Sequence, residues 1–112
     1  MFLKKLIKRK PIEKISLTEI GFCLQIDKKT DKVEWEKISK ITAYKIDLFT
    51  IDQIRFDIQH ANQTVTATEY FQGWEDFLEK LYENLPEIDR EWFQKVAHPT
   101  FETNETEIYS RK

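Results

Sequence analysis

The sequence predicts an α+β protein, a strongly bent antiparallel β-sheet or partly open barrel closed by a C-terminal amphipathic helix. Two successive patterns of apolar residues predict this fold. Between residues 15 and 70, apolar residues recur mainly with the period of two typical of strands, and over residues 73–85 the period becomes helical. Several strands followed by one long helix favour a helix that covers an open side of the sheet. The chain of 112 residues fits a single domain, whose eight Phe, four Tyr and three Trp supply its core.

Residues 1–11 form a basic segment, of which residues 2–10 predict a short amphipathic helix ended by Pro11. One helix face carries its apolar residues, Phe2, Leu3, Leu6 and Ile7. Basic residues occupy the other face, Lys4, Lys5, Lys8 and Arg9. The interrupted apolar pattern lacks the features of a secretory signal. No apolar run in the chain approaches the roughly 20 residues that span a bilayer.

Two strands open the sheet region. Alternating apolar residues predict a strand with one buried face and Cys23 on the other: Ile20, Phe22, Leu24 and Ile26. A polar turn over residues 28–32 follows, after which Val33 and Trp35 resume the alternation. We expect Trp35 to pack in the core because it shares a phase with Val33.

A longer strand over residues 38–48 has an ambiguous phase, which predicts a bend or bulge. Residues 54–58 alternate clearly, and a polar turn at residues 60–63 separates them from Val65 and Ala67. These last two runs predict a β-hairpin.

Residues 73–85 predict the main helix, with Gly73 allowing the turn into it and Pro86 discouraging its continuation. Its apolar residues form one stripe, which we expect to face the sheet: Trp74, Phe77, Leu78, Leu81, Tyr82 and Leu85.

A short second helix is predicted over residues 89–97 and an extended tail over residues 98–112. Asp89 can cap the helix, whose expected anchors are Trp92, Phe93 and Val96. The tail is expected to be pinned at its apolar positions, Phe101, Ile108 and Tyr109.

The order of elements resembles the pleckstrin-homology-like fold over roughly residues 15–85. The stretch from Val33 to Ile41, VEWEKISKI, looks like the bacterial version of that domain, in which a strand ending in Trp precedes a polar turn and Ile-x-x-Ile. The helix at residues 73–85 matches the closing helix of that fold.

A more specific resemblance, from about residue 20 to residue 109, is to small bacterial proteins found beside polymorphic toxins. The segment AYKIDLFTIDQI, residues 43–54, resembles theirs, and their main helix also begins with Gly-Trp, here Gly73-Trp74. A later Trp and a Pro-x-Phe-x-Thr-Asn tail also match, at Trp92 and at residues 99–104. The resemblance implies an immunity role and fixes no binding residues.

Catalytic and metal-binding patterns are weak. Cys23 is the only cysteine, which excludes an internal disulfide and a cysteine-based zinc site and fits a reducing compartment. A third and weaker hypothesis is a small enzyme of unknown class, with either a carboxylate site or a pair formed by Cys23 and one histidine, His60 or His98. The spacing of Asp47, Asp52 and Asp57 favours solvated turn carboxylates. We therefore expect no catalytic residues, metal or cofactor.

The net charge of −2 conceals an asymmetry: residues 1–56 hold 13 basic and 8 acidic residues, and residues 57–112 hold 5 basic and 12 acidic residues. The acidic half disfavours nucleic acid, which needs a basic surface. Glu75, Glu79 and Glu83 recur every four residues and form a row along the main helix. Such a row suits a basic partner, although plain solubility also explains it.

The lead hypothesis is therefore a cytoplasmic, non-enzymatic protein-binding domain, an immunity protein that neutralises a basic toxin. The alternative is a peripheral membrane adaptor that uses residues 2–10, with Lys4, Lys5, Lys8 and Arg9 at the membrane surface.

Overall fold

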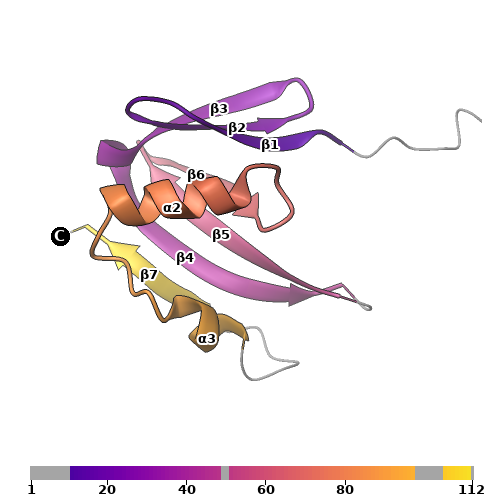
Figure 1. The fold of residues 1–112 in the computed structure, drawn as a ribbon, viewed down its shortest axis with the longest axis vertical. Coiled ribbons are helices and arrows are strands. Elements are labelled where there is room, and N and C mark those ends of the chain that lie inside the picture. The colour runs from indigo at the N-terminus through magenta and orange to yellow at the C-terminus, as the bar shows by residue number, and fades with distance from the viewer. Residues whose placement is uncertain (1–10, 49–50, 98–104, 112) are drawn as a thin grey trace, which may run out of the picture.

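The computed structural model describes residues 11–48, 51–97 and 105–111, which form two antiparallel sheets and two α-helices (Figure 1). The first sheet has the order β1-β2-β3: β1 (Glu13–Leu17), β2 (Gly21–Ile26) and β3 (Lys29–Glu34). The second has the order β6-β5-β4-β7: β4 (Ile38–Asp47), β5 (Asp52–His60), β6 (Gln63–Thr68) and β7 (Thr106–Ser110). One 3-10 turn, η1 (Trp35–Lys37), joins them. The α+β class is confirmed, with two open sheets among the described residues.

The main helix, α2 (Trp74–Asn84), crosses between the two sheets in Figure 1. Its stripe is buried at Trp74, Phe77 and Leu81, and Leu81 has no solvent-exposed surface. The prediction that this stripe faces the core is confirmed. Gly73 precedes the helix with a φ of 87°, a left-handed conformation that glycine adopts without strain.

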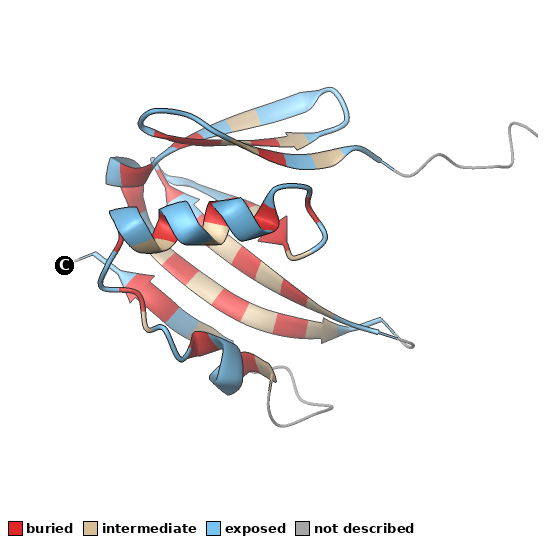
Figure 2. Ribbon diagram, viewed as in Figure 1, coloured by how far each residue is buried: buried red, intermediate tan, exposed pale blue. Residues whose placement is uncertain are grey.

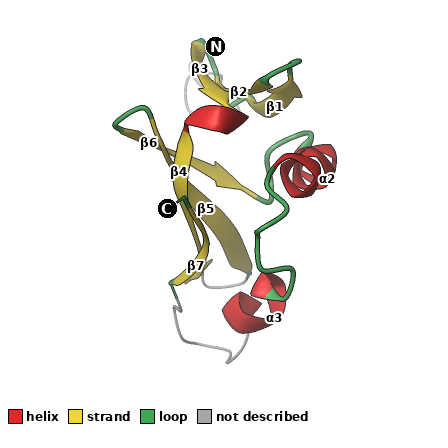
Figure 3. Cartoon of the chain, turned by 90° about the vertical axis from the view of Figure 1, so that its left-hand side faces the viewer, coloured by secondary structure: helices red, strands yellow, loops and turns green. Residues whose placement is uncertain are grey.

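The short helix, α3 (Trp92–Ala97), lies on the same side of the four-stranded sheet as α2, and the opposite face carries no helix in Figure 3. α3 and β7 follow α2, so the predicted short second helix is present, and part of the predicted extended tail is strand β7.

Aromatic rings connect the layers of the core, whose buried residues alternate along the strands in Figure 2. Phe22 of β2 lies 4.8 Å from Phe77 of α2, centroid to centroid. Phe56 of β5 lies 4.8 Å from Trp74 and 4.9 Å from Trp92. One continuous aromatic cluster therefore joins both sheets and both helices.

Strand β4 contains the irregularity that its ambiguous phase predicts. Its register against β5 shifts between Ile38 and Lys40, and its register against β7 shifts between Ile41 and Thr42. The predicted bulge is thus confirmed, as is the β5–β6 hairpin, in which Ile58 pairs with Val65.

Several single-residue predictions are wrong. Trp35 is buried but begins the 3-10 turn instead of continuing a strand. His60 ends β5 with 5% of its surface exposed, whereas a polar turn was expected there. Phe93 is 53% exposed and does not anchor α3 in the core.

The C-terminal segment is a paired strand. Strand β7 pairs with β4 in antiparallel fashion, and Ile108 and Tyr109 are buried as the apolar pattern predicts. The predicted N-terminal helix, with Lys4, Lys5, Lys8 and Arg9, lies outside the described residues, as do His98 and Phe101. Among the described residues, neither helix is long and apolar enough to cross a membrane.

Candidate partner-binding site

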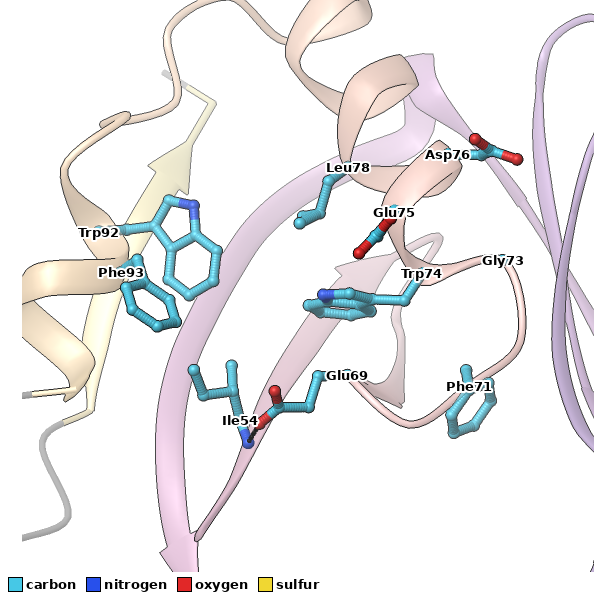
Figure 4. A pocket seen from close by; sticks show the side chains of 10 residues that line it. All are labelled: Ile54, Glu69, Phe71, Gly73, Trp74, Glu75, Asp76, Leu78, Trp92 and Phe93. Atoms are coloured by element: carbon cyan, nitrogen blue, oxygen red, sulfur yellow. Dashed lines mark hydrogen bonds between the residues drawn. The ribbon is translucent and has the colours of Figure 1, made fainter.

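A hollow of about 580 Å³ opens where α2 begins opposite α3 (Figure 4). Its apolar lining comes mainly from the two helices and β5: Ile54, Trp74, Leu78, Trp92 and Phe93. Three acidic residues also line it: Glu69, Glu75 and Asp76. The hollow therefore combines aromatic rings with carboxylates, and no basic residue is among the described residues that line it.

The aromatic wall on the α3 side follows from the geometry of a short helix. Trp92 is buried against Phe56, and Phe93 is rotated about 100° from it around the helix axis. The Phe93 ring therefore faces outward, and it contacts the Trp92 ring edge-to-face with centroids 5.7 Å apart. This arrangement leaves a large apolar ring at the mouth of the hollow.

Glu69 follows β6 and is held in place by the backbone of Ile54. The Glu69 amide donates to the Ile54 carbonyl over 3.0 Å, and the Ile54 amide donates to Glu69 Oε2 over 2.7 Å (Figure 4). A carboxylate fixed in this way has little side-chain freedom left to lose when a ligand binds.

Glu75 and Asp76 occupy the first turn of α2, where the helix dipole favours negative charge. Figure 4 shows the Glu75 carboxylate turned toward the Trp74 ring and the Asp76 carboxylate turned away from the aromatic rings. Glu75 and Glu69 are thus the carboxylates placed to meet a ligand among these rings.

The predicted row of Glu75, Glu79 and Glu83 is exposed along α2, but only Glu75 lines the hollow. Glu83 accepts a hydrogen bond from Lys80 Nζ over 3.0 Å in an exposed ion pair. The negative charge of the row is therefore greatest toward the hollow end of the helix.

Polar contacts fix α3 and its aromatic residues. Asp89 Oδ1 accepts from the Glu91 amide over 3.0 Å, and its other carboxylate oxygen pairs with Lys95. The hydrogen bond from Lys95, followed by that from Glu91, lowers the pKa of Asp89. Trp92 Nε1 donates to Tyr82 Oη over 2.8 Å, which ties α3 to α2.

Sequence reasoning missed Glu69 and placed Phe93 in the core. Trp92 and Phe93 lie about 100° apart around a short helix, so the spacing does not decide which of the two rings faces inward. Glu69 carries no sequence signal either, because its position depends on a backbone contact to β5.

A cavity of about 240 Å³ includes Cys23, and no histidine is among the described residues of its lining; His98 lies outside the described ranges. Within the described ranges, no three His, Cys, Asp or Glu side chains are grouped so as to hold a metal ion. Asp57, expected to be a solvated turn carboxylate, is half-buried on β5 and accepts hydrogen bonds from Tyr44 and Thr66.

Comparison with protein-family models, curated proteins and solved structures finds no match to this chain.

Proposed function

We propose that this chain is a non-enzymatic, cytoplasmic protein-binding domain that neutralises a basic toxin, as an immunity protein does. The observation that carries the proposal is the acidic, aromatic-lined hollow at the exposed start of α2. Aromatic rings are enriched in the centres of protein interfaces, and a single-sign field around them steers an oppositely charged partner.

The charge of the surrounding surface supports a basic partner. Between Glu75 and Glu91 the sequence holds seven acidic residues and two basic ones, Lys80 and Arg90. Both basic residues are engaged locally, Lys80 with Glu83 and Arg90 over the Tyr82 ring at 4.4 Å. Acidic groups here would occupy the positions that substrate phosphates take in the cleft of a toxin that acts on nucleic acid.

The pleckstrin-homology-like arrangement is part of the same proposal. It is supported by two antiparallel sheets with α2 lying between them. Strand β7, which returns after the helix to pair with β4, would be an addition to that arrangement.

The test begins with pull-down, or with the neighbouring genes, to identify a partner. Association rates are then measured at two salt concentrations for the wild type and for the Glu79→Lys, Glu83→Lys double variant. We expect the double reversal to slow association, with the larger effect at low salt, because screening reaches about 10 Å at 0.1 M.

The matched control is Glu19→Lys, Glu34→Lys, which makes the same change of net charge at exposed positions in the β1–β2 turn and at the end of β3. We expect it to have a smaller effect on association. A neutral or acidic partner, or rates unchanged by the reversal on α2, would contradict the proposed function.

A further inference from the structure

We propose that the hollow receives one arginine side chain of the basic partner, with its guanidinium between the aromatic rings and the carboxylates of Glu69 and Glu75. This inference rests on the proposed function, because it names the group by which the partner is held. Unlike steering by the overall surface charge, this contact requires one particular cavity.

The lining selects a cation with an apolar or planar body. Trp74, Trp92 and Phe93 line the hollow with aromatic rings, of which Phe93 is the exposed one, and the faces of such rings attract positive charge. Glu69 and Glu75 add two negative charges at the same opening. An anionic or neutral polar side chain would lose hydration on entering and would meet no basic residue among the described residues of the lining.

A guanidinium fits these groups better than an ammonium. It is planar, so it stacks on aromatic rings, and its five N–H donors reach two carboxylates at once. It is also more weakly hydrated than the lysine ammonium, so it enters a partly apolar hollow with less loss of hydration.

The site is prepared before a ligand arrives. Glu69 is fixed by the Ile54 amide at 2.7 Å, and Trp92 is fixed by its hydrogen bond to Tyr82 at 2.8 Å. Phe93 is half-exposed at the mouth, where burial by a partner would remove further apolar surface from water. Binding therefore requires little reorganisation of the hollow.

The experiment titrates the full chain with the peptide acetyl-Gly-Arg-Gly-amide and follows the indole N–H signals by NMR. Trp74 and Trp92 line the hollow, whereas Trp35 lies elsewhere in the core and serves as an internal reference. We expect saturable shifts of Trp74 and Trp92 with Trp35 unmoved. Absence of these shifts at saturating peptide would overturn the proposal.

Two matched peptides test the chemistry of recognition. Citrulline in place of arginine keeps the shape and removes the charge, and we expect it to cause no saturable shift. Lysine keeps the charge and removes the planar fork, and we expect weaker binding. Equal affinity for either peptide would overturn the assignment of a guanidinium site.

Two variants test the carboxylates. Glu69→Gln keeps an oxygen that can accept from the Ile54 amide while removing the charge, and Glu75→Gln removes the second charge. We expect the double variant to bind the arginine peptide at least about tenfold more weakly, as loss of a charge-assisted hydrogen bond implies. The control is Glu19→Gln, an exposed carboxylate outside both the hollow and the acidic row of α2, which should change affinity little.

Failure of this inference can be told apart from failure of the proposed function. If a basic partner binds the wild type and the Glu69→Gln, Phe93→Ala variant equally, the arginine proposal is overturned and the proposed function stands. If the arginine peptide binds but no basic protein partner exists, the proposed function fails and the inference about a partner's arginine fails with it.

Discussion

Leu81 is the residue by which the position of α2 is most directly tested. It lies at the middle of the buried stripe and has no exposed surface. We expect Leu81→Ala to lower the free energy of unfolding by about 2–5 kcal/mol, because a large-to-small change there loses transfer free energy and leaves a cavity. Urea unfolding followed by tryptophan fluorescence measures it.

The control for Leu81 is Leu17→Ala in β1, where the side chain is exposed. We expect that change to stay within about 0.5 kcal/mol of the wild type. Similar losses for both variants would show that the stripe of α2 does not face the core.

Tyr44 provides a test at alkaline pH. Partial burial, followed by the hydrogen bond its hydroxyl donates to Asp57 over 3.1 Å and the charge of that carboxylate, raises the pKa of Tyr44 above its ordinary value. The folded protein therefore keeps this proton to a higher pH than the unfolded chain, so the free energy of unfolding falls as pH rises past about 10.

Tyr44→Phe removes this titration. We expect the difference in unfolding free energy between the wild type and the variant to be constant below about pH 9 and to shift against the wild type by about pH 11. Urea unfolding across that range measures it. A difference that does not change with pH would mean that Tyr44 titrates alike in both states.

At the scale of elements, the pairing of β2 with β3 requires a glycine at position 21, because β3 leaves no room there for a Cβ atom. A Cβ built on Gly21 would lie 1.8 Å from the Val33 carbonyl oxygen and 2.8 Å from the Glu34 Cα. We expect Gly21→Ala to cost more than about 1 kcal/mol, since the two strands must separate to admit the methyl group. Unfolding in urea measures this, and near-ultraviolet circular dichroism reports any displacement of nearby Trp35.

Cys23→Ala, two residues along the same strand, is the matched control because Cys23 is only half-buried. It should cost clearly less than Gly21→Ala. The opposite order would contradict the close approach of β3 to β2 at Gly21.

The elements that periodicity predicts are those whose apolar pattern is complete within a short stretch of sequence. The β5–β6 hairpin and the stripe of α2 are of this kind. The pattern does not predict strand β1, although β1 pairs with neighbouring β2, because Ile15 is the only buried residue among its five. Similarly, the sequence of β7 predicts only an extended tail, because its strand partner β4 is distant in the sequence.

At the scale of the whole molecule, one part of the candidate site could be predicted from the sequence and another part could not. The sequence indicated an acidic face from Glu75 onward because charge and helical spacing are local properties. It did not indicate the hollow, which needs the loop carrying Glu69, the start of α2 and the outward face of α3 in one place. These three segments are brought together only by the tertiary structure.

Residues 2–10 also bear on whether the whole molecule binds a membrane surface. Five of them are basic, and four others form the predicted apolar helix face. They lie outside the residues that the structure describes. Nine residues form a marginal helix alone, and anchoring at a membrane surface must also order them. We therefore expect the full chain not to float with anionic liposomes, even at low salt, where attraction between basic residues and anionic lipids is strongest.

Deletion of residues 1–10 completes this test. If the domain acts through α2, the shortened chain should bind the basic partner with unchanged affinity, because the hollow and the acidic row lie entirely within the retained residues. Flotation of the full chain that is lost on deletion would instead favour the peripheral membrane adaptor. In that case the positive first half of the sequence, and not the acidic helix, would carry the main interaction.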